Sequence, residues 1–403
     1  MSAIWQRGAA VLSVAVVLGT AAAADLEQTA LFEAGQGGYA MYRIPGLVVT
    51  PKGTLLAYCE ARKTSGDWAK IDIMMRRSAD GGRSWEPMRK VVELKGTFTK
   101  NEVALAKRIG KPDEITVNNP VAIPDATTGA VHFLYCVEYA RCFYQRSDDD
   151  GKTFGEPVEI TATFDRFRPE YAWKVLATGP GHGIQLASGR LLVPVWLSTG
   201  TGGGAHRPSV VSTITSDDHG ATWQRGEVVA NETDPLVNPN ETTAAQLADG
   251  RVMLNIRHES PSHRRAVAFS ADGATRWTRP AFDEQLKEPI CFASLCRLAA
   301  GGKSRLLFAN PDNLDRAAGP AKPGQGRDRK NLTIRLSEDD GKTWAKSRVL
   351  EPGTSGYSDL AALPDGTVCC LYERGGIDGK AATQTKTLTL ARFGLDWLTA
   401  DPK

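Results

Sequence analysis

The stretch SEDDGKTW at residues 337–344 sets three carboxylates and a lysine around one glycine and ends on tryptophan. Octads of the same pattern, Ser-x-Asp-x-Gly-x-(Thr/Ser)-(Trp/Phe), begin at Ser78, Ser147 and Ser216, and a degenerate copy, SADGATRW, begins at Ser270. Each octad follows a short run of β-branched or alternating apolar residues, and a strand that enters an Asp/Gly turn is typical of a β-hairpin. The repeat therefore predicts a series of hairpins along the chain.

A second repeat lies between the octads and consists of a glycine followed by an apolar strand. Its copies are GTLLAYCE from Gly53, GAVHFLYC from Gly129, GRLLVPVW from Gly189, GRVMLNIR from Gly250, the looser KSRLLFAN from Lys303, and GTVCCLYE from Gly366. All-β chains with radial repeats of this size are propellers. We therefore expect an all-β, six-bladed β-propeller over residues 25–403. Because the sixth sheet has no octad, we expect it to borrow a strand from the N-terminal end of the mature chain.

The acidic octads are better explained as turns than as metal loops. An EF-hand loop needs a glutamate at its twelfth position, and none of the octads supplies one. In a turn, the Asp side chain accepts backbone N–H bonds, the glycine takes the positive φ, and the aromatic residue packs inward. The sequence also has no Cys/His cluster at zinc-ligand spacing, so we expect no bound metal.

The bulk composition indicates a globular chain with a cleavable leader. With 403 residues, 41% apolar residues and a net charge of +3, the chain gives no case for nucleic-acid binding. Arg7 and an apolar stretch that ends in small residues predict a signal peptide over residues 1–24, hence a secreted or periplasmic protein with no membrane association after cleavage. The alternative is an uncleaved anchor, for which the Ala-rich stretch is marginal.

Seven cysteines are an odd number for a disulfide framework. Cys369 and Cys370 are adjacent in a strand-like run, so their side chains are expected to point to opposite faces. One bridge, either Cys136–Cys142 or Cys291–Cys296, stays open at this point.

Charged residues, and in one copy a tryptophan, recur at one position of the second repeat. Seven residues after the glycine lie Glu60, Trp196, Arg257 and Glu373, and Arg62 follows Glu60 on the same face of its strand. Surface strands also alternate charges, but the shared register favours a site where the innermost strand of each blade is expected to end.

The ordered set of motifs resembles the exo-α-sialidases (neuraminidases) of glycoside hydrolase family 33, which are Asp-box or BNR-repeat proteins. The resemblance runs from Tyr39 to Trp397. It rests on YRIP at 42–45, EARKTSGDW at 60–68, GPGHGIQL at 179–186, NETTAAQLADGRVMLNIR at 240–257, RKNLTIRLSEDDGKTW at 329–344 and GYSDL at 356–360. One octad alone is weak evidence, but the ordered set is specific. It implies a retaining glycosidase that hydrolyses terminal α-linked sialic acids.

By this resemblance, Arg43, Arg257 and Arg329 clamp the carboxylate of the sugar. Guanidinium groups match carboxylate oxygens bidentately and stay charged at any working pH. Glu373 is expected to brace Arg43 and offset the repulsion among the arginines, and Arg62 to reach the region of the 4-hydroxyl. Taken alone, any one of these arginines could equally belong to a solvated face.

The resemblance also implies Tyr357 as nucleophile, Glu241 as its base and Asp67 as general acid/base. A neutral phenol avoids the repulsion that an aspartate would meet at a carbon carrying a carboxylate, and the tyrosine nucleophile is the known exception among retaining glycosidases. We expect Trp68 and the bound sugar to desolvate Asp67 and help it hold a proton. No cofactor is implied. Without the resemblance, Asp67 reads as a turn aspartate and Tyr357 as a core or rim tyrosine.

Several alternatives stay open at this point. Tyr42 replaces the usual phenylalanine of the opening motif, which leaves Arg43 in place. The polar segments 95–114 and 311–328 either line the pocket or are passive insertions. The expected partners are sialylated glycoproteins, glycolipids or oligosaccharides, bound by a monomer. Rival functions are a non-catalytic sialic-acid-binding lectin, a trans-sialidase, and an enzyme specific for a related nonulosonic acid.

Overall fold

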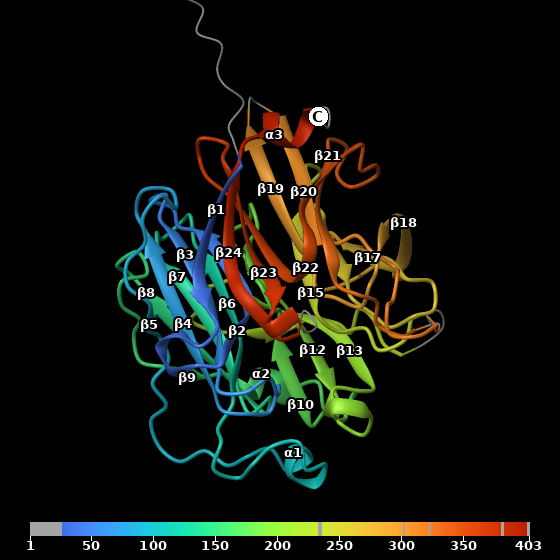
Figure 1. The fold of residues 1–403 in the computed structure, drawn as a ribbon. Coiled ribbons are helices and arrows are strands. Elements are labelled where there is room, and N and C mark those ends of the chain that lie inside the picture. The colour runs from blue at the N-terminus through green and yellow to red at the C-terminus, as the bar shows by residue number, and fades with distance from the viewer. Residues whose placement is uncertain are drawn as a thin grey trace, which may run out of the picture.

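Each octad forms the turn between the third and the fourth strand of its blade, and the molecule is built from five such blades and a sixth without an octad (Figure 1). The computed structural model describes residues 26–232, 236–300, 303–320, 322, 324–379 and 383–400. The predicted signal peptide, residues 1–24, lies outside the described residues. The expected six-bladed β-propeller is confirmed, with antiparallel strand pairs throughout the blades.

The first three blades follow one another along the chain. Blade 1 contains β2 (Met41–Val49), β3 (Leu55–Arg62), β4 (Ile71–Ser78) and β5 (Arg89–Lys90). Blade 2 contains β6 (Val117–Pro124), β7 (Val131–Val137), β8 (Arg141–Ser147) and β9 (Val158–Glu159). Blade 3 contains β10 (Val175–Thr178) and β11 (Ile184–Gln185), which both pair with β12 (Leu191–Ser198), then β13 (Ser209–Ser216) and β14 (Gln224–Arg225).

The last three blades close the ring. Blade 4 contains β15 (Thr242–Gln246), β16 (Val252–Ile256), β17 (Arg264–Ser270) and β18 (Ala281–Lys287). Blade 5 contains β19 (Ser294–Ala300), β20 (Lys303–Pro311), β21 (Lys330–Ser337) and the first part of β22 (Lys346–Ala362). Blade 6 contains the rest of β22, β23 (Val368–Gly376), β24 (Thr385–Phe393) and β1 (Glu27–Glu33).

The ring is closed by two continuous strands. β22 pairs with β21 up to Thr354 and with β23 from Ser355, so one strand of 17 residues is outermost in blade 5 and innermost in blade 6. The N-terminal strand β1 pairs antiparallel with β24 and completes blade 6, as expected from the missing octad (Figure 1). Because the two ends of the ring belong to one sheet, blade 6 cannot open without breaking main-chain hydrogen bonds.

The structure corrects the order of strands within a blade. The glycine-led strands of the second repeat are β3, β7, β12, β16, β20 and β23, and each is the second strand of its blade. The innermost strands precede them, and hydrogen bonds join one innermost strand to the next, as from Leu360 N to Ser294 Oγ and from Leu295 N to Thr243 Oγ1. Apolar residues on both faces mark a buried strand, but they do not reveal its distance from the axis.

Helices are few and short in the described residues. The α-helices are α1 (Glu102–Ala106), α2 (Thr161–Asp165) and α3 (Leu395–Thr399), and the 3-10 turns are η1 (Gln36–Gly38), η2 (Gly203–Ala205) and η3 (Ile377–Gly379). None of the described helices is long and apolar enough to span a membrane.

The hydrophobic core lies between the faces of neighbouring blades. One cluster packs Leu56 and Tyr58 of blade 1 against Val131 and Phe133 of blade 2, and comparable clusters fill the other gaps. Cys369 and Cys370 belong to different clusters, so they point to opposite faces as predicted. All seven cysteines are free thiols, including the cross-strand neighbours Cys136 and Cys142.

The octads form the turns predicted for them. In the last one, Asp339 Oδ1 accepts hydrogen bonds from Thr343 N and Ser337 Oγ, both at 2.8 Å, and Gly341 has φ +82°. The degenerate copy forms a similar turn that is one residue shorter. There, Asp272 accepts hydrogen bonds from the N–H groups of Ala274 and Thr275. The aspartate at the third position of each octad therefore serves its own turn.

A buried carboxylate ties the innermost strands together at the propeller axis. Asp359 of β22 accepts hydrogen bonds from Leu47 N of β2 at 2.8 Å and from Ser294 Oγ of β19 at 2.9 Å. His182, just before β11, contacts the same carboxylate through Nδ1 at 2.8 Å, and the pKa of the His182 imidazole is raised because this attraction outweighs its burial. Four blades thus meet on one side chain.

Candidate active site

The predicted site residues gather around Tyr357 of β22, close to the propeller axis. Three guanidinium groups surround its ring, with Cζ atoms 5.2 Å (Arg43), 5.9 Å (Arg257) and 5.2 Å (Arg329) from the ring centroid. They come from blade 1, from the residue after β16 in blade 4 and from the residue before β21 in blade 5. Ile44, Cys291 and Phe292 pack with Tyr357 as an apolar floor.

The arginines hold unused hydrogen-bonding capacity. Arg329 donates from Nη2 to the carbonyl of Ile290 at 2.8 Å, whereas its Nη1 is buried without a hydrogen-bond partner among the described residues. The same is true of Nε of Arg257. Buried donors that lack a partner cost free energy, so their presence beside three converging cations indicates a site for an anionic ligand.

Glu373 holds one side of the clamp in place. Its Oε1 and Oε2 accept from Nε and Nη2 of Arg43 at 3.0 and 3.3 Å, and both residues are buried. The same carboxylate accepts from the backbone N–H groups of Ile44 and Tyr357 at 3.2 and 3.0 Å. A Cβ at position 356 would lie 2.2 Å from Oε2, which explains the glycine of the GYSDL motif. Glu373 therefore positions both Arg43 and Tyr357.

The phenol of Tyr357 has a carboxylate and a guanidinium as immediate partners. Its hydroxyl donates to Glu241 Oε2 at 2.5 Å and accepts from Nη1 of Arg257 at 2.6 Å, and Arg257 also forms an ion pair with Glu241. Burial raises the pKa of Tyr357 well above its usual range, more than Arg257, Arg329 and Arg43 lower it. The resting phenol is therefore neutral, and it can lose its proton only to a base such as Glu241.

Asp67 is held in place by Arg62. Arg62 donates from Nη1 to Asp67 Oδ1 at 2.7 Å, and from Nε and Nη2 to Glu60 Oε2 at 2.9 and 2.6 Å. Arg62 and Glu60 are fully buried, whereas the Asp67 side chain is 46% exposed.

Without a bound sugar, the pKa of Asp67 is lowered, whereas the expected raised pKa concerned the site with sugar bound. Desolvation raises its pKa, but the attraction of Arg62, His206 and Arg43 together lowers it below the usual range. In the ligand-free protein Asp67 is therefore an ionised partner of Arg62, and the desolvating effect expected from Trp68 is outweighed.

An aromatic wall stands beside Asp67, and the sequence did not reveal its members His206 and Tyr139. Trp68 stacks on His206 with ring centroids 5.6 Å apart, and Tyr139 and Trp196 pack against the same imidazole. Nε2 of His206 and Nε1 of Trp196 are buried without hydrogen-bond partners among the described residues. Both line a small cavity of about 60 Å³ next to Glu241. His206 follows a glycine-rich run in sequence, GTGGGA, which carries no signal of such packing.

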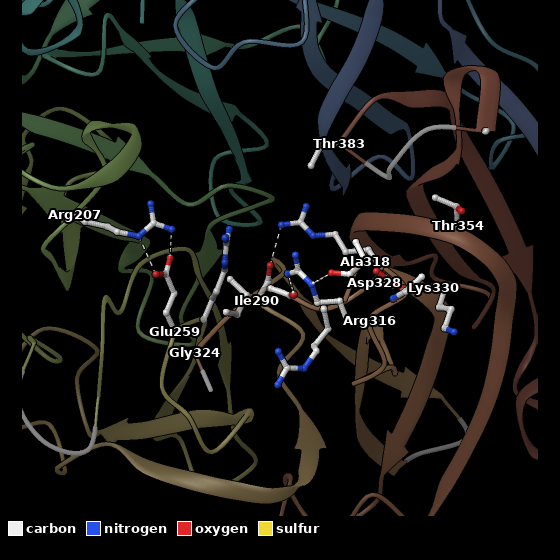
Figure 2. A pocket seen from close by; sticks show the side chains of 16 residues that line it. Arg207, Glu259, Ile290, Arg316, Ala318, Gly324, Asp328, Lys330, Thr354 and Thr383 are labelled. Atoms are coloured by element: carbon white, nitrogen blue, oxygen red, sulfur yellow. Dashed lines mark hydrogen bonds and ion pairs between the residues drawn. The ribbon is translucent and has the colours of Figure 1, made fainter. Parts of the chain in front are cut away.

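A larger pocket of about 750 Å³ opens from Arg257 and Arg329. One wall is built by residues 316–318, 324 and 326–328, so the polar segment 311–328 lines the pocket and is no passive insertion. Figure 2 shows the Arg207–Glu259 pair on one side of this pocket, Arg316 and Asp328 on the other, and Ile290 between them. The segment 95–114, by contrast, contributes no residue to the described lining.

No cluster of three or more His, Cys, Asp or Glu side chains that could hold a metal ion occurs in the described part of the chain. The site geometry is thus built from arginines, carboxylates and one phenol.

Comparisons with known proteins identify the family of the chain. The profile of the BNR repeat-like domain family matches residues 100–370. The chain is 32% identical to a sialidase of Micromonospora viridifaciens, over 90% of this chain and 53% of that protein. It is 31% identical to a sialidase of Bacteroides fragilis, over 84% of this chain and 61% of that protein. The chain thus spans little more than half the length of these two relatives.

Among solved structures, the Hadza microbial sialidase Hz136 superposes with a TM-score of 0.73 and 28% identity, over 92% of this chain and 69% of that one. The matching repeats, the relatives in sequence and the shared propeller lead to one assignment. The chain belongs to the sialidase family of BNR-repeat proteins.

Proposed function

We propose that this protein is a retaining exo-α-sialidase, which hydrolyses terminal α-linked sialic acids from glycoproteins, glycolipids or oligosaccharides with Tyr357 as nucleophile. The observation that carries the proposal is the 2.5 Å hydrogen bond from the phenol of Tyr357 to Glu241, inside a ring of three guanidinium groups. Nucleophilic attack at a carbon that bears a carboxylate requires a neutral phenol, an adjacent base and a cationic clamp.

In the first half-reaction, the substrate carboxylate replaces solvent at Arg43, Arg257 and Arg329. The Tyr357 oxygen attacks the anomeric carbon while its proton passes to Glu241, and the bond to the leaving oxygen breaks. Asp67 protonates that oxygen, so the leaving group departs as a neutral alcohol.

In the second half-reaction, Asp67 takes a proton from water, and the resulting hydroxide attacks the same carbon. The bond to Tyr357 breaks, and Glu241 returns the proton to the phenolate. Two inversions at one carbon give net retention of configuration. No cofactor takes part in this scheme.

Because Asp67 is paired with Arg62 in the ligand-free protein, substrate binding can change the pKa of Asp67. A sugar hydroxyl that accepts a hydrogen bond from Arg62 competes with the carboxylate of Asp67. Weaker attraction and the loss of solvent both raise the pKa of Asp67, so binding itself favours the protonated acid.

A sialic-acid-binding lectin with the same fold would keep the arginine clamp but need no base beside Tyr357. The close pair of Tyr357 and Glu241 therefore favours the enzyme. From the N-terminal pattern at residues 1–24 we further propose that the protein acts outside the cytoplasm, in the medium or the periplasm. The reaction product distinguishes hydrolysis, which releases free sialic acid, from transfer of the sialic acid to a second sugar.

The test is incubation with a fluorogenic α-sialoside, with proton NMR of the first-formed product. We expect release of sialic acid as its α-anomer and a loss of at least about 10³-fold in turnover for Tyr357→Phe. Failure of the wild-type protein to release sialic acid or a related nonulosonic acid from any α-glycoside tested would overturn the proposal. A first-formed β-anomer would exclude the tyrosine intermediate.

A further inference from the structure

The large pocket beside the clamp carries more positive charge than one sugar carboxylate can use. Its described lining includes six cationic side chains, Arg207, Arg257, Arg316, Arg327, Arg329 and Lys330. Two lining residues carry a negative charge, Glu259 and Asp328. At about 750 Å³ the pocket is large enough for more than one sugar ring.

Ion pairs account for half of these cations. The pairs are Arg207–Glu259, Arg257–Glu241 and Lys330–Asp315. Arg329 has no carboxylate partner among the described residues, and its buried Nη1 is free for the carboxylate of the sialic acid. After this assignment, Arg316 and Arg327 are left over.

Arg316 and Arg327 are held in place by neutral groups. Arg316 donates from Nε to Ala318 O at 3.0 Å and from Nη1 to Gly326 O at 3.2 Å. Arg327 donates from Nη1 to Gln325 O at 2.6 Å and to Lys322 O at 3.0 Å.

Backbone carbonyls orient these two guanidinium groups but do not neutralise them. Of the carboxylates that the structure describes, none forms an ion pair with either one, and the Asp328 carboxylate accepts instead from Ala317 N at 2.7 Å. Both side chains are partly buried, so the cost of keeping two like charges on one wall is only partly screened by water.

The chemistry of the substrate relates this wall to the leaving group. In an α-sialoside, the anomeric carbon bears both the carboxylate and the glycosidic oxygen, so a substrate clamped at Arg329 presents its leaving group within a few bonds of that arginine. Arg327 lies two residues before Arg329, on the wall of the pocket that opens from the clamp. An anionic group on the leaving sugar would meet Arg316 and Arg327 there.

We propose that Arg316 and Arg327 form a subsite for a second anionic group, carried by the leaving sugar. This inference rests on the proposed function and extends it to a substrate class, namely sialosides whose penultimate sugar bears a sulfate ester or is itself a sialic acid. Guanidinium forks match sulfate and carboxylate oxygens alike, so the shared chemistry is an oxyanion with two acceptor oxygens.

The test compares three substrates: 3′-sialyllactose, the same trisaccharide with a 6-O-sulfate on galactose, and α2,8-linked disialyllactose. For wild type we expect kcat/KM on at least one of the two substrates with a second anionic group to exceed that on 3′-sialyllactose about tenfold. The difference is expected to lie in KM and to become smaller at high salt. The substrate that wild type prefers shows whether the second anionic group is a sulfate ester or a second sialic acid.

Arg327→Gln is expected to bring that ratio close to one, whereas the charge-retaining Arg327→Lys keeps part of it. Arg83→Gln, a surface arginine in the first octad turn, is the matched control and keeps the full ratio. Equal kcat/KM of wild type on all three substrates overturns the subsite. An equal fall on all three substrates in Arg327→Gln also overturns it, since the arginine would then serve the loop or the clamp.

The subsite can be separated from the proposed hydrolysis by binding alone. Calorimetric titration with lactose 6′-sulfate and with lactose tests the leaving sugar without any chemistry. Tighter binding of the sulfated sugar to wild type, but not to Arg327→Gln, supports the subsite even if no sialic acid is ever released. Absence of any difference for the sulfated sugar, together with absence of a preference for disialyllactose, overturns it.

Discussion

The octad turns and the pocket around Tyr357 both concentrate charged residues, yet they treat charge in opposite ways. Asp339 accepts its hydrogen bonds from Thr343 and Ser337 of its own turn, within a few residues along the chain. Around Tyr357, charges from distant segments meet, and buried donors of Arg257 and Arg329 have no partner among the described residues. Charge that is satisfied locally builds the scaffold, whereas charge gathered from afar and left unsatisfied indicates a ligand site.

The substitution Glu241→Gln tests this comparison most strongly. The amide side chain keeps the size of the glutamate but cannot accept the phenol proton, so we expect kcat to fall about 10²- to 10⁴-fold in the fluorogenic assay. The thermal midpoint is expected to change little, because Arg257 can still donate to the amide oxygen. An unchanged kcat would mean that the 2.5 Å contact with Tyr357 is structural, like the octad contacts.

Glu373→Gln is expected to have the next largest effect, and it acts through Arg43. Each carboxylate oxygen of Glu373 accepts from Arg43 and from one backbone N–H, so an amide nitrogen in place of either oxygen would face two donors and two buried contacts would be lost. We expect kcat/KM to fall roughly 10- to 100-fold, mainly through KM, because the clamp loses its geometry. Glu373→Asp, which keeps the charge, is the control and restores part of the affinity. A fall in kcat alone would contradict a role in positioning the clamp.

The pH dependence of kcat/KM tests the resting partner of Asp67. Arg62 lowers the pKa of Asp67, so removal of Arg62 raises it. Because catalysis needs the protonated acid, kcat/KM falls as pH rises through that pKa, and this limb is expected to move to higher pH by roughly one to two units in Arg62→Gln. Combining it with Glu60→Gln avoids a buried unpaired carboxylate. The position of the limb is the readout, since its height also reflects lost substrate contacts. A limb that stays in place contradicts control by Arg62.

The sequence allowed most of the fold and most of the site to be predicted, for different reasons. The octads and the glycine-led strands repeat, so counting them led to six blades and to the closing role of β1. The predicted position of the glycine-led strands within their blades was wrong. A strand such as β3 or β16 has the same apolar pattern whether it is the innermost or the second strand of a blade. Arg43 and Glu373 are 330 positions apart and could be paired only through the family resemblance.

The features of the ligand-free site that the sequence did not predict have a common physical origin. Trp68 is next to Asp67 in sequence and suggested desolvation, but the pKa of Asp67 is governed by the guanidinium of Arg62, whose direction follows from the fold. His206 joins the wall from another blade. Contacts of this kind depend on side-chain orientation, which neither repeats nor spacing record.

The smallest effect is expected where the sequence is most conspicuous, at the octad SEDDGKTW. Asp339→Ala removes the acceptor for Thr343 N and Ser337 Oγ, which we expect to lower stability by about 1 kcal/mol and the thermal midpoint by a few degrees or less, with kcat unchanged. These hydrogen bonds keep the pKa of Asp339 below its ordinary value, so the stability they provide is present at neutral pH and is lost as pH falls through the depressed pKa. Glu338→Ala, which removes a neighbouring surface charge that forms no turn contact, is the matched control and is expected to stay within about 0.5 kcal/mol of wild type. If Asp339→Ala instead lost turnover without loss of stability, the separation of scaffold charge from site charge would be wrong for this protein.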